Sequence, residues 1–181
     1  MQKGYEWLWQ EKGLPKMLQE MLKIHGTLEG PGDSNNPTIL AWAKEVGASR
    51  LGMAYSKDSV PWCGLGMAVC AKRAGYEPPA IAIRALSWAS FGVPVPLAEG
   101  PKLGDILVLT RAGGGHVCQY VGEDATTYHV IGANQKDSVR IDRIAKERVY
   151  SISRCKWPRG QPASVRRVFL STGGALSQNE A

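Results

Sequence analysis

The hydrophobic pattern of this chain changes its period once, and that change is the strongest constraint on the fold. Before residue 92 the apolar residues recur with helical spacing, and after residue 105 they alternate along short segments as in β-strands. The Pro-rich segment VPVPLAEGP at 93–101 separates the two halves. Helices followed by strands predict an α+β domain, with N-terminal helices packed on a C-terminal antiparallel sheet of about five strands.

Helix signals in the first half predict four helices. We expect them at residues 14–24, 36–46, 61–75 and 85–92, with an irregular segment at 48–61. The second begins at Asn36, because Pro37 then occupies the first helical position, where the missing N–H of proline is not needed. The last two end at Gly75 and Gly92, since glycine readily adopts the left-handed conformation that closes many helices.

Five strands are predicted in the second half. They are expected at residues 105–110, 116–122, 127–134, 138–144 and 148–157. Glycine-containing segments at 113–115 and 122–124 supply turns between them, so we expect the strands to form an antiparallel meander. Residues 1–158 are predicted to form this domain, and residues 159–181 a basic, loosely held tail.

The positive charge of the chain lies mostly near its end. The sequence has 22 Lys and Arg against 16 Asp and Glu, and residues 140–181 hold nine basic and three acidic side chains. A basic segment favours a polyanionic neighbour, such as nucleic acid, anionic lipid or an anionic wall polymer, and it is also typical of a solubilising surface.

Two further patterns concern location. No apolar segment approaches the roughly 18 residues needed to cross a bilayer, and the N-terminal MQKGYEWLWQEKG lacks the apolar run of a signal peptide. We therefore expect no transmembrane segment and synthesis in the cytoplasm, with any export by a route that the sequence does not show. A monomer is the default expectation.

Among the four cysteines, Cys63 has the setting of a nucleophile. It falls in the first turn of the 61–75 helix, where unpaired N–H groups and the positive end of the helix dipole favour thiolate. Cys70, Cys118 and Cys155 are interpreted as core residues. Since no CxxC pair occurs, we expect neither a disulfide framework nor a zinc site.

His116 is the histidine best placed to act as a base. It opens a predicted strand after three glycines, which suggests an exposed imidazole at a sheet edge. Asn134 ends the next strand, and a hairpin would bring its side-chain oxygen beside His116, where it would fix the tautomer of the imidazole. The order Cys, His, Asn is the order used by cysteine proteases of the papain type.

Five motifs in order resemble those of a known superfamily. The runs are DSVPWCGLGMAVCAKRAG, RALSWASFG, KLGDILVLTR, GGHVCQYVGED and HVIGANQKDSV, and upstream of them lies EGPGDSNNPTIL. Together they resemble the CHAP and NlpC-like superfamily of peptidoglycan hydrolases, and most closely a phage- and prophage-associated branch. The resemblance covers about residues 14–158.

The resemblance implies a papain-like cysteine peptidase fold and hydrolysis of amide bonds in the bacterial wall, by an amidase or a stem-peptide endopeptidase. It implies Cys63 as nucleophile, His116 as general base and Asn134 as the orienting residue. Many CHAP members have a Glu two residues before that Asn, where this chain has Gly132, and the GGNQ of the branch appears here as Gly-Ala-Asn-Gln. The acidic calcium loop of some members is not evident, so no metal and no other cofactor is expected.

Four further residues are candidates for lining the substrate groove. They are Asp58, Trp62, Ser87 and Trp88. For the two tryptophans the alternative is core packing, and for Asp58 it is bracing of the loop before Cys63.

The function expected from the sequence is a phage endolysin-like enzyme that acts on peptidoglycan after release or delivery from the host cytoplasm. An antibacterial effector with the same chemistry is one alternative. A non-enzymatic basic phage protein, structural or nucleic-acid-binding, is another, although no reading helix or aromatic-interleaved basic strand supports specific nucleic-acid binding.

Overall fold

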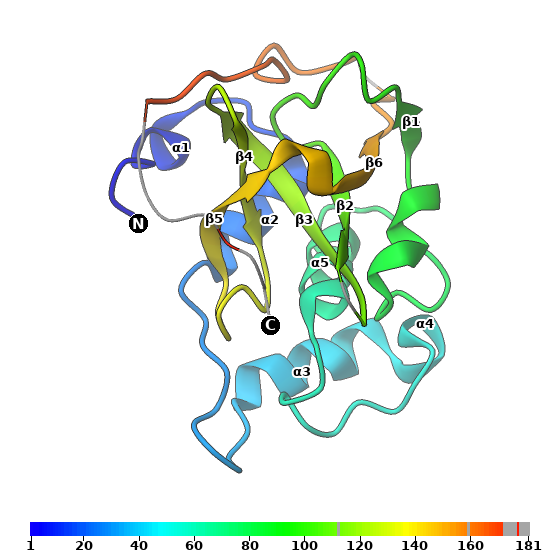
Figure 1. Ribbon diagram of the computed structural model, residues 1–181. Helices are drawn as coiled ribbons and strands as arrows, with labels where there is room; N and C mark the ends of the chain where they lie inside the picture. Colours follow the sequence, from blue (N-terminus) through cyan, green and yellow to red (C-terminus); the bar gives the residue numbers. More distant parts are fainter. Residues whose placement is uncertain (112, 159, 172–176, 178–181) are drawn as a thin grey trace.

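A six-stranded antiparallel sheet occupies the centre of the structure, a computed structural model that describes residues 1–111, 113–158, 160–171 and 177 (Figure 1). The strands are β1 (Val93–Val95), β2 (Ile106–Arg111), β3 (Gly114–Glu123), β4 (Thr127–Gly132), β5 (Arg140–Ala145) and β6 (Val149–Arg154), in the sheet order β1-β6-β2-β3-β4-β5. The chain is therefore an α+β protein, as the sequence predicts, with six strands in place of about five.

The prediction of a simple meander is wrong at the last strand. Strands β2 to β5 are neighbours in chain order, but β6 returns across the sheet and pairs with β2, for example at Leu107 and Ile152. The unpredicted strand β1 pairs with the outer side of β6 and contains Pro94. Because proline lacks an N–H, it is tolerated in an edge strand. The Pro-rich segment that separates the two halves of the sequence can therefore also form this strand.

The helices follow the sequence signals closely. They are α1 (Trp7–Gln10), α2 (Lys16–Ile24), α3 (Pro37–Val46), α4 (Ala48–Leu51), α5 (Cys63–Arg73) and the 3₁₀ helices η1 (Ala85–Ser90) and η2 (Lys146–Arg148). The start of α3 is confirmed in detail, since the Asn36 side chain accepts a hydrogen bond from the Thr38 N–H at 2.8 Å. The helix predicted at 85–92 is the 3₁₀ helix η1, and the single turns α1 and α4 are additional.

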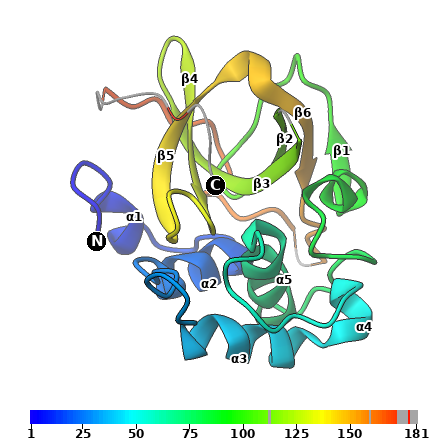
Figure 2. The same cartoon turned by 60° about the horizontal axis from the view of Figure 1, so that its bottom comes forward.

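Helices α2, α3 and α5 gather on one side of a curled sheet, as the turned view in Figure 2 shows. Along β3 alternate residues face opposite ways. Val117 and Val121 join the core that these helices cover, whereas Cys118 and Tyr120 join a smaller apolar cluster on the other face. This alternation separates the side chains of β3 that face the helices from those that face the inside of the curl.

The segment after β6 is held more tightly than the sequence predicts. The Leu103 N–H donates to the Arg166 carbonyl at 2.9 Å, and Glu123 exchanges backbone hydrogen bonds with Val168 and Leu170 at 2.8 Å each. Residues 166–170 therefore run beside the end of β3 as an added strand-like segment. Residues 159, 172–176 and 178–181 of the predicted loose tail lie outside the described residues.

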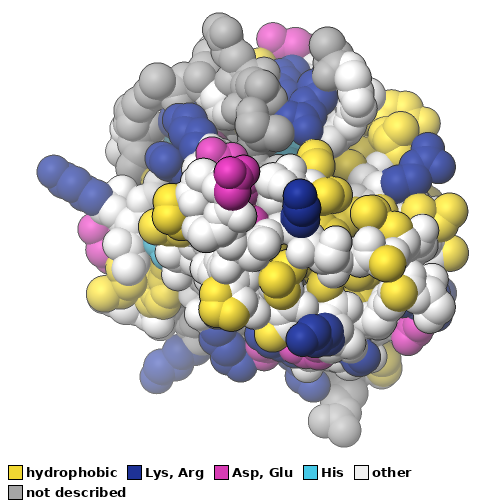
Figure 3. Space-filling model, turned by 90° about the horizontal axis from the view of Figure 1, so that it is seen from below, with side chains coloured by type: hydrophobic (Ala, Val, Ile, Leu, Met, Phe, Trp, Pro, Cys, Tyr) yellow, Lys and Arg dark blue, Asp and Glu magenta, His cyan; other side chains and the backbone are white. Residues whose placement is uncertain are grey.

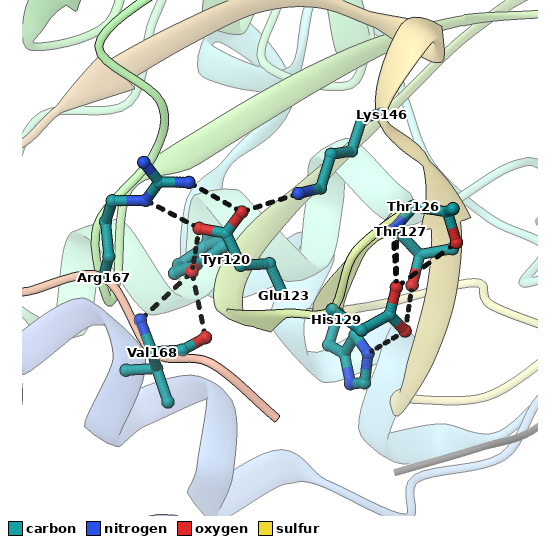
Figure 4. A network of polar contacts seen from close by, with 9 residues as sticks. Tyr120, Glu123, Thr126, Thr127, His129, Lys146, Arg167 and Val168 are labelled. Atoms are coloured by element: carbon teal, nitrogen blue, oxygen red, sulfur yellow. Dashed lines mark hydrogen bonds and ion pairs between the residues drawn. The ribbon is translucent and has the colours of Figure 1, made fainter. Parts of the chain in front are cut away.

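A buried carboxylate anchors this segment (Figure 4). Glu123 has no exposed surface, and it accepts hydrogen bonds from Arg167 at 2.8 and 2.9 Å, from Lys146 at 2.7 Å and from the Tyr120 hydroxyl at 3.0 Å. Burial acts to raise the pKa of Glu123, but these hydrogen bonds outweigh it and lower the pKa.

Most of the basic side chains near the C-terminus are paired within the protein. Ion pairs join Arg140 to Asp142, Arg143 to Asp124, Lys146 and Arg167 to Glu123, Arg154 to Asp105 and Glu99, and Arg166 to Glu11. The positive excess of this region thus attaches its strands and tail to acidic groups of the domain.

The structure was also searched for membrane-crossing helices. In the parts of the chain that it describes, every helix is too short or too polar to span a bilayer.

Candidate active site

Cys63 is the first residue of α5, as the sequence predicts, but its thiol is 4% exposed. Burial raises the pKa of the Cys63 thiol, while hydrogen bonds from the backbone of Val117 and Gly64 and the charge of Arg111 act in the opposite direction. The N–H groups at the helix terminus act to lower the pKa of this thiol, as the sequence predicts, but desolvation acts more strongly and raises it.

The start of α5 fills a gap beside β3. Strand β3 pairs with β4 only from Gln119 onward, and β4 ends at Gly132. The first residues of β3 therefore extend past the paired part of β4, and the backbone of Val117 meets the Cys63 thiol there. Val117 follows His116 in β3, so the backbone that meets the nucleophile candidate belongs to the same strand as the base candidate.

The two glycines after Cys63 permit this close packing. A Cβ built at Gly66 would lie 2.3 Å from the Cβ of Ala133, just beyond the end of β4, so the helix could not approach the sheet this closely with a larger residue there. At Gly64 a Cβ would lie 2.3 and 2.4 Å from the carbonyl oxygens of Ala82 and Ile83. Gly64 thus lets α5 pack against the loop at Ala82 and Ile83, and Gly66 lets it pack against the end of β4.

His116 is buried, with 1% of its surface exposed, which corrects the expectation of an exposed imidazole. The glycines before it do form the tip of the β2–β3 hairpin, but β3 already begins at Gly114 and carries His116 into the sheet, opposite Leu109. The imidazole Nε2 lies 3.0 Å from Oε1 of Gln135.

The Gln135 carboxamide fixes the tautomer of His116. Its Nε2 donates to the carbonyls of Arg140 at 2.8 Å and Val130 at 3.4 Å, so its Oε1 is the acceptor that faces His116. His116 Nε2 must then carry the proton, and the lone pair of the imidazole lies on Nδ1. A neutral histidine with a basic Nδ1 is the form that a general base requires.

The role predicted for Asn134 belongs instead to the next residue. Asn134 stands at φ +55°, in the left-handed region, and so turns the chain out of β4. Its Oδ1 is buried without a hydrogen-bond partner among the described residues, while Gln135 points back at His116. The Gln of the Gly-Ala-Asn-Gln run was the available signal, and the assumption that the strand continues to residue 134 concealed it.

Gly132 leaves room for this contact. A Cβ built at Gly132 would lie 2.7 Å from Gln135 Oε1 and 3.2 Å from His116 Nε2. A side chain at this position would therefore intrude on the hydrogen bond between Gln135 and His116.

Three of the four predicted groove residues have structural roles. Trp62 and Trp88 are fully buried, and their indole N–H groups donate at 2.9 Å to Glu29 and to the Ala82 carbonyl. Asp58 is buried and accepts from the backbone N–H groups of Gly30 and Asn36 at 2.8 and 2.7 Å, which braces the loop before Cys63. The alternatives of core packing and bracing are therefore the correct ones for these residues. Ser87 is half-buried on η1.

The segment 81–86 forms one border of the site. Its start abuts Gly64, and Leu86 comes near Gly115, since a Cβ built on that glycine would lie 3.5 Å from Leu86 Cδ2. Ile81 and Leu86 are 44% and 41% exposed, and Ile81 adopts φ +54°, which is unusual for a β-branched residue. Figure 3, seen from below, shows hydrophobic side chains grouped between basic ones on the face that carries α3 and α4.

Three surface cavities, with volumes of about 410, 440 and 480 Å³, lie away from the candidate residues. They are lined by residues around α1 and α2, by the segments near Tyr76 and Phe91, and by the segments near β1 and Trp157. Within the described residues no three His, Cys, Asp or Glu side chains gather as a metal site.

Comparison with known proteins gives no family for the chain. None of the protein-family models matches it, and no curated protein is significantly similar to it in sequence.

Proposed function

We propose that this protein is a cysteine hydrolase of papain-like fold that cleaves an amide bond of bacterial peptidoglycan, as an endolysin-like amidase or endopeptidase. The observation that supports it best is the hydrogen bond between His116 Nε2 and Gln135 Oε1, on the strand whose Val117 backbone contacts the thiol of Cys63 at the start of α5. This pairing leaves a basic imidazole nitrogen on the strand that contacts the sulfur. The wall substrate rests on the resemblance of five motifs.

The first half of the proposed reaction starts from a neutral thiol. His116 Nδ1 takes the proton of Cys63 Sγ as the sulfur attacks the amide carbonyl carbon. The negative charge that develops on the carbonyl oxygen accepts a hydrogen bond from the Cys63 backbone N–H at the start of α5. His116 then gives its proton to the amide nitrogen, the C–N bond breaks, and the amine leaves a thioester on Cys63.

Water completes the cycle. His116 Nδ1 removes a proton from water as the oxygen attacks the thioester carbonyl. The C–S bond breaks, the carboxylic acid leaves, and the proton returns to the sulfur. Gln135 keeps its hydrogen bond to Nε2 throughout, and this holds the imidazole in the orientation that serves both halves.

The test is the loss of turbidity of purified sacculi. Wild type should clear the suspension, and Cys63→Ala and His116→Ala should be slower by at least about 10³-fold, as is usual when a nucleophile or its base is removed. Cys70→Ala is the matched control, because Cys70 is a buried cysteine about two turns further along α5, and this variant should remain active. Equal clearing by wild type and Cys63→Ala would disprove the assignment.

Mass spectrometry of the released muropeptides identifies the bond. Products that separate sugar from peptide indicate an amidase, and products cut within the peptide indicate an endopeptidase. An antibacterial effector of the same chemistry would give the same products, so a neighbouring immunity gene is the sign that distinguishes it.

A further inference from the structure

The geometry points to Arg111 as a specificity residue that binds a carboxylate of the substrate next to the scissile amide. This inference rests on the proposed hydrolase and adds to it the chemical class of substrate: an amide whose neighbouring group is anionic. The KLGDILVLTR run ends at Arg111, but neither the resemblance nor the predicted groove residues give this arginine a role.

The register of the β2–β3 hairpin places Arg111 beside the base. Leu109 pairs with His116, and Arg111 pairs with Gly114, two positions further along. Paired residues of antiparallel strands share a face, and alternate residues of one strand share it too. Arg111 and His116 therefore extend from the same face of the hairpin, on adjacent strands and two residues apart, which is within reach of a long side chain.

The same geometry brings the guanidinium charge to the nucleophile. Arg111 is half-exposed, and its charge acts on the buried Cys63 thiol. A group bound to Arg111 would thus lie near the sulfur and still contact solvent. A guanidinium has five N–H donors in a planar fork, so it binds a carboxylate through two parallel hydrogen bonds while other donors serve the protein.

The hairpin leaves space for such a group. Gly114, directly across from Arg111, has no neighbouring atom within 4 Å of the position that a Cβ would occupy. Gly115, which follows, points to the opposite face, where Ala85 and Leu86 lie. A substrate carboxylate can therefore lie over Gly114, beside the guanidinium.

The experiment compares two synthetic wall peptides that differ only in one group beside the scissile bond, a carboxylate in one and a carboxamide in the other. Wild type should cleave the carboxylate peptide with a kcat/KM at least about 10-fold higher, which is the value of one charge-assisted contact. Arg111→Gln should bring the ratio close to one, and Arg111→Lys should keep part of it, since lysine keeps the charge without the fork.

Arg73→Gln is the matched control, because Arg73 is an exposed arginine at the opposite end of α5 from Cys63. It should keep the wild-type ratio. A ratio near one in wild type, or an unchanged ratio in Arg111→Gln, would overturn the inference. A purely structural role for Arg111 would slow both peptides equally and leave the ratio intact.

Binding separates this inference from the proposed reaction. Calorimetry on Cys63→Ala, with and without Arg111→Gln, measures the affinity for both peptides without turnover. If wild type cleaves neither peptide, the hydrolase proposal fails. The anion site is still supported if calorimetry shows tighter binding of the carboxylate peptide and Arg111→Gln removes that difference. Equal affinity for the two peptides, or no binding of either, overturns it.

Discussion

The carboxamide of Gln135 makes the contact on which the proposed chemistry of His116 depends. Its amide nitrogen is committed to two carbonyls, so its oxygen has one orientation and the imidazole has one tautomer. Asn134 is close in sequence but turns away at φ +55°. The sequence predicts the places of Cys63 and His116 in the fold, because a helix start and a glycine turn are visible as patterns. It does not predict that Gln135 contacts His116, because the left-handed turn at Asn134 makes the next residue, and not Asn134, point toward the imidazole.

Replacing Gln135 tests this assignment. Gln135→Ala should lower kcat by about 10- to 100-fold, because the imidazole loses the hydrogen bond that fixes its tautomer and orientation. Asn134→Ala, the matched control, should keep kcat within about 3-fold, since Asn134 Oδ1 has no hydrogen-bond partner in the described part of the chain. Steady-state kinetics on one peptide checks both variants. A larger loss in Asn134→Ala than in Gln135→Ala would restore the role predicted from the sequence.

Helix α5 depends on its second glycine to meet the sheet. Gly66→Ala would place a methyl group 2.3 Å from the Cβ of Ala133, and overpacking of this kind costs about 1–3 kcal/mol of unfolding free energy. Gly114→Ala is the control, because its Cβ would meet open space. Urea denaturation should show a lower midpoint for Gly66→Ala alone. Two equal midpoints would mean that α5 can shift without cost.

Element boundaries were predictable where a local signal determines them. Asn36 and Pro37 give the start of α3 because the cap and the fixed φ are properties of those two residues. The partner of β6 has no such signal, since its position beside β2 depends on contacts between distant segments, such as Ile106 with Ser153. The papain-like arrangement expected from the motifs thus agrees with the structure at the level of an α+β antiparallel sheet.

The C-terminal segment is attached to the whole domain through Glu123. Glu123→Gln should lower the unfolding free energy by about 1–3 kcal/mol, because Arg167 and Lys146 lose their charged partner. Hydrogen exchange should increase at residues 166–170 before it increases elsewhere. Glu99→Gln, which removes an exposed ion pair with Arg154, should have a much smaller effect. Unchanged protection of residues 166–170 would contradict this attachment.

The ion pairs of Glu123 with Arg167 and Lys146 also predict how the stability of the fold responds to acid. The pKa of Glu123 is lower in the folded protein than its ordinary value of 4.5. Its contribution is therefore present above about pH 4.5 and is lost as the pH falls further. Urea midpoints of wild type should fall below pH 4.5 more steeply than those of Glu123→Gln. Parallel curves would show that other carboxylates dominate.

Alkali should weaken the fold through its buried thiols. Burial raises the pKa of Cys155 from 9.0 to about 12, so the folded protein holds a proton that the unfolded chain releases. This contribution is complete below about pH 9 and decreases as the pH rises toward 12, by about 1–2 kcal/mol at pH 10.5. Denaturation at pH 8 and 10.5 measures it. Cys155→Ala should reduce the decrease, and equal decreases in both proteins would exclude Cys155 as its source.

The burial of Cys63, which raises the pKa of its thiol, also predicts how the protein responds to oxidants. Peroxides convert cysteine to sulfenic acid through the thiolate, at rates that follow its exposure to solvent. Cys63 is 4% exposed, and burial raises the pKa of its thiol, so the residue offers little thiolate and little exposure. We therefore expect the resting protein to survive storage in aerated buffer without a reductant, and to become vulnerable to peroxide mainly during turnover, when proton transfer to His116 creates the reactive anion.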